Sequence, residues 1–123
     1  SIGFRAGFGD GSSYEPNRGF WLRYDKTGTY NDTGFMCVVR NAAVNTTSPM
    51  GILADTNWHT LRMWKYANSG YVNFSLDGSN PPVQVIHNDN NGARLALFNL
   101  VTYSGASVTA SFDYFGFEGF TNR

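Results

Sequence analysis

Apolar and polar side chains alternate along most of this chain. Since successive side chains of a β-strand point to opposite faces, such a period of two predicts strands with one buried face. No segment shows the sustained 3.6-residue spacing of an amphipathic helix. The predicted strands cover residues 4–8, 20–25, 35–40, 58–66, 71–77, 83–86, 95–103 and 108–117.

The pattern also assigns faces to these strands. Val72, Phe74 and Leu76 are expected to point inward, and Asn73 and Ser75 outward. In residues 58–66 the apolar Leu61 and Met63 share one face, opposite Arg62 and Trp64. Residues 35–40 are apolar on both faces, which indicates a central strand.

Turn signals separate the predicted strands. Asn68-Ser69-Gly70 and Asp77-Gly78 are typical of hairpin turns, and Pro81-Pro82 fits only a loop or a sheet edge. Polar loops are expected over residues 26–33, 41–49 and 87–92. Eight or nine short strands at spacings near ten residues predict an all-β, antiparallel β-sandwich or jelly roll, formed as a single domain over residues 1–123.

Composition narrows the classes of partner. Charged residues make up 15% of the 123 residues, and nine basic and nine acidic residues give a formal net charge of zero with no run of like charge. This distribution argues against a nucleic-acid partner and against electrostatic docking to an anionic membrane. No apolar run approaches the roughly 20 residues of a membrane span, so no membrane insertion is expected.

The single cysteine, Cys37, lies in an apolar stretch with no activating base nearby. We therefore expect a small buried hydrophobe and not a nucleophile. The chain begins at Ser1 directly inside a strand-like segment, which suggests a processed product or an excerpt of a longer protein.

A more specific pattern occurs in the middle of the chain. Asp55-Thr56-Asn57-Trp58-His59-Thr60-Leu61-Arg62 is followed by Gly70-Tyr71-Val72-Asn73-Phe74-Ser75-Leu76-Asp77-Gly78. This resembles the laminin G-like and concanavalin A-like jelly-roll families, in which a strand carrying Trp-His leads through a hairpin to a strand ending in Asp-Gly. The similarity is tightest to versions in bacteriophage structural proteins and bacterial surface proteins. It implies a concanavalin A-like jelly roll, a fold that serves lectins, hydrolases, adhesion modules and virion proteins.

The chain departs from that resemblance at its start. Gly7-Phe8-Gly9-Asp10 sits where members of these families have a comparable strand. Family members usually have further strands before that one, and these are missing here. An incomplete sheet exposes an unpaired edge, which another chain or segment tends to cover. We therefore expect that residues 2–8 pair with a neighbouring subunit, or that a parent polypeptide supplies the missing strands.

Catalytic residues are not evident. Glycoside cleavage needs two carboxylates facing one sugar ring, and no alternating acidic run occurs. Glu15 lies in a turn, while Asp113 and Glu118 are five residues apart and so fall on opposite faces of a strand. We therefore expect that the chain is not an enzyme.

Metal ligands are similarly sparse. His59 and His87 are too few for a zinc site, and His59 is expected to hydrogen-bond locally as part of the strand signature. Some relatives of the resembled families hold calcium through loop oxygens, but Asp and Asn are also ordinary turn formers. No cofactor and no metal are predicted, although calcium stays open; its loop candidates are Asp10, Asp77, Asp89 and Asn91.

Two tryptophans stand opposite the expected core faces. Trp21, beside Arg23, alternates with Phe20 and Leu22, so an outward indole could stack on a sugar while arginine binds its hydroxyl groups. The alternative is that both tryptophans pack against a neighbouring loop, strand or subunit. The candidate glycan-binding residues are Trp21, Arg23, Arg62, Trp64 and Tyr66.

Together these features predict a non-catalytic surface module. The favoured role is a structural or decoration protein of a bacteriophage virion, with neighbouring subunits as partners. The alternative is a lectin-like attachment or adhesion module that binds cell-surface glycan. Either role places the chain on a virion surface or outside a cell.

Overall fold

The fold is described by a computed structural model over residues 2–11, 16–26, 29–66, 69–87 and 95–102. These residues form eight strands and no helix, which confirms the all-β prediction for this part of the chain. Accordingly, no helix long and apolar enough to cross a membrane occurs among them.

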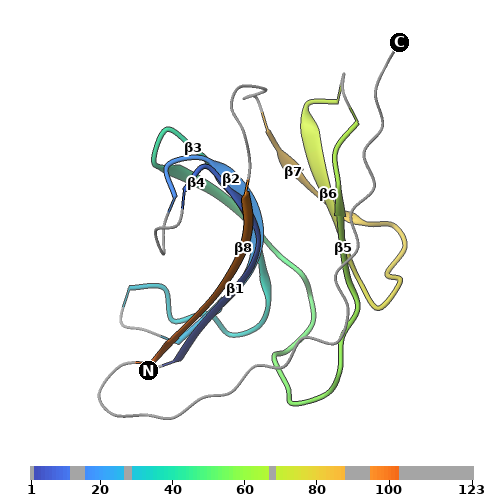
Figure 1. Cartoon of the computed structure of the whole chain (residues 1–123). Helices are drawn as coiled ribbons and strands as arrows, with labels where there is room; N and C mark the ends of the chain where they lie inside the picture. Colours follow the sequence, from blue (N-terminus) through green and yellow to red (C-terminus); the bar gives the residue numbers. More distant parts are fainter. Residues whose placement is uncertain (1, 12–15, 27–28, 67–68, 88–94, 103–123) are drawn as a thin grey trace.

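Two antiparallel sheets pack face to face (Figure 1). The larger sheet has the order β4-β3-β2-β1-β8, and the smaller one has the order β5-β6-β7. The chain therefore runs through four neighbouring strands, crosses to form the small sheet and returns to the edge of the large one. The strands are β1 (Ile2–Gly9), β2 (Gly19–Asp25), β3 (Met36–Asn41), β4 (Val44–Pro49), β5 (Leu61–Trp64), β6 (Tyr71–Leu76), β7 (Val83–Ile86) and β8 (Leu95–Thr102).

The main core lies between the sheets. Val72, Phe74 and Leu76 of β6 are buried in it, as the alternation predicts. Leu22 and Val39 meet them from the large sheet, and Leu61 and Met63 pack against the same cluster from β5. Burial of these side chains supplies the main drive for holding the layers together.

Cys37 belongs to this core, as predicted. Its side chain is fully buried, with Sγ 3.4 Å from Met50 Sδ. Burial raises the pKa of the thiol to about 12, so the group is protonated at neutral pH and is not poised as a nucleophile.

A second apolar cluster lies on the other face of the large sheet. Trp21 and Val38 are buried there, with Met36 packed against them. Residues 29–33, which belong to the connection from β2 to β3, lie on this side, away from the small sheet (Figure 1). The strand expected over residues 35–40 is therefore buried on both faces because Val39 faces one cluster and Val38 the other.

The loop predicted over residues 41–49 is wrong. Val44–Pro49 form β4, which pairs with β3 through a hairpin. Ala42 and Ala43, with φ of 48° and 66°, make the tight connection that suits a two-residue hairpin. The strand shows no apolar alternation because its side chains are exposed or only partly buried on both faces.

The expectation of an unpaired first strand is also wrong. β1 is bonded on both sides, to β2 from Gly3 to Gly9 and to β8 from Ile2 to Gly9. The returning β8 takes the place that a neighbouring subunit was expected to fill. The strand predicted over residues 108–117 lies outside the described residues.

We expect Gly7→Ala to destabilise the fold. A Cβ atom at Gly7 would lie 2.5 Å from Trp21 Cα and closer still to the backbone oxygen of Phe20. Such overpacking costs about 1–3 kcal/mol or more, whereas Gly11→Ala meets nothing within 4 Å and should change stability by less than about 0.5 kcal/mol. Urea denaturation of both variants measures the difference, and equal free energies of unfolding would contradict this close approach of β1 and β2.

Candidate functional site

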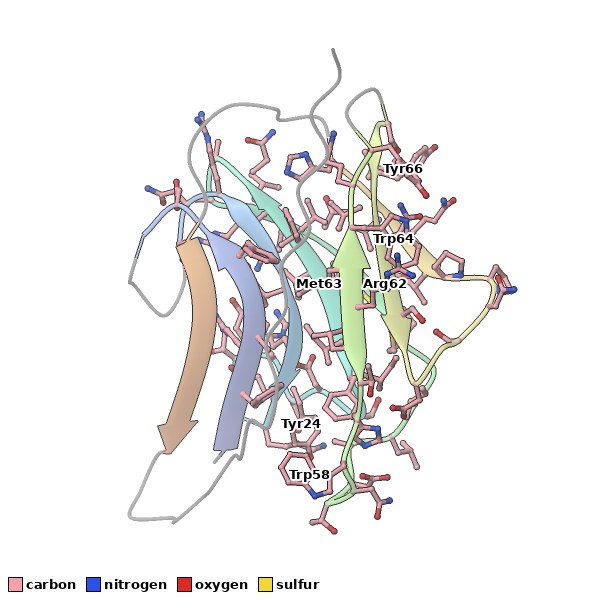
Figure 2. The ribbon with its side chains drawn as sticks, turned by 45° about the vertical axis from the view of Figure 1, so that its right-hand side comes forward. Tyr24, Trp58, Arg62, Met63, Trp64 and Tyr66 are labelled. Atoms are coloured by element: carbon pink, nitrogen blue, oxygen red, sulfur yellow. The ribbon has the colours of Figure 1, made fainter. Side chains whose placement is uncertain are left out.

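The outward side of the small sheet carries the side chains most suited to recognition. The inward side chains of β5 to β7 pack in the core, so the alternate ones face away from the large sheet. Figure 2 shows Arg62, Trp64 and Tyr66 on that side, with Met63 pointing between the sheets. We call this surface the outer face; its residues are Arg62, Trp64, Tyr66, Tyr71, Asn73, Ser75, Gln84 and Ile86.

One end of the outer face is an exposed apolar row. Tyr71 and Ile86 are direct cross-strand partners, and they are 44% and 51% exposed. Continuing the β5–β6 register by two residues places Tyr66, which is 67% exposed, across from Tyr71. Three bulky side chains thus line up across the sheet with much of their surface open to solvent.

A polar row lies next to it. Gln84 Nε2 donates a hydrogen bond to Asn73 Oδ1 at 2.9 Å, and Asn73 Nδ2 donates to the Trp64 carbonyl at 3.3 Å. Asn73 lies on the outer face as predicted, yet it is buried beneath its neighbours, as is Ser75. Gln84 is exposed, so its amide can hydrogen-bond a ligand without losing its fixed position.

The third row carries the charge. The Arg62 guanidinium lies over the Trp64 ring, 5.0 Å from its centroid, in a cation–π contact. Arg62 is exposed and Trp64 is half-buried. The indole therefore orients the guanidinium on the surface and leaves its N–H groups open to solvent.

Trp21 and Arg23, which the alternation placed on the ligand surface, do not belong to it. Trp21 is 1% exposed and lies in the second cluster, on the far side of the other sheet. Arg23 is buried in a two-bond ion pair with Asp32, at 2.8 and 2.9 Å, and stacks on Tyr30 at 3.8 Å. The alternation gave the correct face of β2, but the loop that carries Tyr30 and Asp32 covers Arg23 there.

A separate cluster joins the start of β5 to the end of β6. His59 Nδ1 lies 2.7 Å from Asp77 Oδ2, and His59 Nε2 lies 2.8 Å from Asp55 Oδ1. The predicted local hydrogen bonding of His59 is therefore confirmed. We call these three residues the His59 clamp.

The clamp geometry requires a protonated imidazole. Ionised carboxylates only accept hydrogen bonds, so both ring nitrogens must donate, which only the imidazolium form does. Hydrogen bonds to Asp77 and then to Asp55 raise the pKa of His59. The bond from His59 lowers the pKa of Asp77, while the backbone N–H of Asn57, followed by His59, lowers that of Asp55.

The strand predicted over residues 58–66 is shorter in the structure, at Leu61–Trp64, and the clamp lies where its first residues were expected. Asp77 Oδ1 accepts a hydrogen bond from the Thr60 backbone N–H at 2.8 Å, so a side chain takes part in pairing beyond the regular ladder. Phe35 packs edge-on against the imidazole, with the ring centroids 5.6 Å apart. The segment before β5 is thereby fixed to the turn after β6.

The calcium candidates are only partly described. Both Asp77 oxygens already accept protein hydrogen bonds, and Asp10 Oδ1 accepts one from the Arg18 backbone N–H at 3.1 Å. In the described ranges no group of three or more His, Cys, Asp or Glu side chains is arranged to hold a metal ion. Asp89 and Asn91, the remaining calcium candidates, lie outside the described residues, as do Glu15, Asp113 and Glu118, the carboxylates that the sequence pattern rejected as a catalytic pair.

Sequence reasoning missed three members of the outer face, namely Tyr71, Gln84 and Ile86. A signal for them was present, because they alternate with inward residues such as Val72 and Val85. What the sequence lacked was the β5–β6–β7 register, which brings them next to Trp64 and Tyr66.

Comparison with known protein families, curated proteins and solved structures finds no match to this chain.

The His59 clamp predicts a pH-dependent stability. Because the folded pKa of His59 is raised above its ordinary value of 6.5, the stabilisation is complete below pH 6.5 and is lost as the pH rises through the folded pKa. His59→Gln should remove this part of the pH dependence. Thermal unfolding at a series of pH values from below 6.5 to well above it measures the effect.

The control for that experiment is Arg62→Gln, which removes an exposed cation outside the clamp. It should keep the pH dependence of the unmodified chain. If His59→Gln and the unmodified chain lost stability in parallel as the pH rose, the imidazolium assignment would be incorrect.

Proposed function

We propose that this chain is a non-catalytic surface module that binds glycan through its outer face. The observation that carries the proposal is the exposed row of Tyr66, Tyr71 and Ile86 beside Trp64 and Arg62. Large apolar side chains left open together on a folded surface are typical of a site that another molecule covers.

The chemistry of the outer face suits a saccharide. The C–H faces of a pyranose pack on aromatic rings, and planar amide or guanidinium groups pair with its hydroxyl groups. Tyr66 and Tyr71 offer the rings, while Gln84 and Arg62 offer polar groups next to them. An outer face built on one sheet suits an extended sugar chain lying along the strands.

The proposal includes a concanavalin A-like jelly-roll arrangement. Support comes from the Trp58-His59 and Asp77-Gly78 segments, which meet through the His59 clamp. The proposal also puts the module outside a cell or on a virion, in keeping with the families that the chain resembles.

A structural or decoration role in a bacteriophage virion is the second candidate. Leu53 and Trp58 are 73% and 71% exposed, and Trp58 lies at the opposite end of the small sheet from Tyr66 (Figure 2). Such side chains suit a contact with a neighbouring subunit. The expected pairing of residues 2–8 with a neighbouring subunit no longer supports this role, because β1 is paired on both sides within the chain.

The glycan proposal predicts that Tyr66→Ala and Tyr71→Ala each weaken glycan binding about tenfold, since ring stacking beyond simple burial contributes up to about 1.5 kcal/mol. The intact chain is first applied to a glycan array, and the affinities of the variants are then measured by calorimetry. Trp58→Ala is the matched control, because it removes an equally exposed aromatic ring at the other end. Absence of any glycan binding, or equal loss with Trp58→Ala, would refute the role of the outer face.

The second candidate predicts a different response. Sedimentation over a range of concentrations should show self-association that Trp58→Ala and Leu53→Ala weaken and that Tyr66→Ala leaves unchanged. A chain that stays monomeric with all of these residues intact would argue against subunit contacts between copies through this end.

A further inference from the structure

We infer that the glycan bound by the outer face is acidic and that Arg62 binds its carboxylate; the inference rests on the function proposed above. Arg62 is exposed, and its guanidinium is held over Trp64. Among the described residues no carboxylate forms an ion pair with it. The outer face therefore presents one oriented cation and no acidic side chain.

Two other arginines of this chain, Arg5 and Arg23, form ion pairs within the fold. Arg5 lies 3.6 Å from Asp25, and Arg23 forms its two-bond pair with Asp32, with all four side chains buried. Those guanidinium groups have their counter-ions within the fold. Arg62 has its planar fork of donors available for an external anion, and that fork matches a carboxylate through two parallel hydrogen bonds.

The direction of approach follows from the neighbouring charges. Asp55 and Asp77 lie beyond the start of β5, where one imidazolium is shared by two carboxylates and leaves a net negative charge. Arg62 leans the other way along the strand, toward Trp64. An anionic group is therefore favoured on the Trp64 side of Arg62, which is also the side of the aromatic row.

The spacing along this segment sets where the acidic group of the ligand lies. Trp64 and Tyr66 are two residues apart, which corresponds to about 7 Å along an extended chain, and the Arg62 guanidinium lies over the Trp64 ring. The arrangement thus fits an acidic saccharide with a ring on the Tyr66–Tyr71 row and its carboxylate at Arg62.

The test uses matched pairs of glycans with the whole chain. An array carries sialylated and uronate-containing oligosaccharides beside the same chains with their carboxylates methyl-esterified, together with neutral glycans. We expect the free acids to bind about tenfold more tightly than their esters, as one charge-assisted contact would give. Arg62→Gln should abolish that difference, and Arg62→Lys should restore it in part, because lysine keeps the charge without the planar fork.

The outcomes separate this inference from the function on which it rests. Binding of neutral glycans only, or equal binding of acids and esters, would overturn the acidic ligand and leave glycan binding intact. The same holds if Arg62→Gln keeps the preference for free acids. If no glycan binds at all, the proposed function itself fails, whereas loss on Tyr66→Ala of binding that prefers the free acid supports both.

Discussion

Burial of one face of β6 against the large sheet sets the placement of nearly everything discussed above. Val72 and Phe74 are fully buried and Leu76 almost so. A slip of one residue in the pairing of β6 would turn these side chains to solvent, at a cost of several kcal/mol from exposed apolar area. The register is therefore strongly specified, and it is this register that sets Trp64 beside Asn73 and Tyr71 beside Ile86.

The outward side chains of the two sheets differ in how far they are buried. On the large sheet, Trp21 and the charged side chains of β1 and β2 are buried, and Arg23 is covered by Tyr30 and Asp32. These buried charges lie opposite partners of the other sign, Arg23 with Asp32 at 2.8 Å and Arg5 with Asp25 at 3.6 Å, and this attraction offsets part of the cost of desolvation. On the small sheet, Tyr66, Tyr71 and Ile86 are exposed, and no other described residue covers them in this way. The difference is why the glycan proposal places the ligand on the small sheet.

Local patterns predicted the described strands other than β4, and the inward faces of the core strands, because burial on a pleated strand imposes a period of two. They failed where the outcome depends on contacts distant in sequence. β4 has no apolar face to reveal it, and the pairing of β1 depends on β8, some ninety residues later. The burial of Trp21 could not be predicted for a related reason. Alternation shows to which face of the sheet a side chain points, but not whether another segment covers that face.

The His59 clamp combines a local sequence pattern with contacts between residues distant in sequence. The Trp-His and Asp-Gly segments suggested a paired hairpin, but only the structure shows one imidazole bonded to carboxylates from both segments. The clamp fixes the segment just before β5. Arg62 is the first side chain of β5 that points to the outer face. Because the acidic groups of the clamp are engaged with His59 and with the N–H groups of Thr60 and Asn57, they do not pair with Arg62. The same contacts that stabilise the hairpin thus leave the guanidinium available on the outer face.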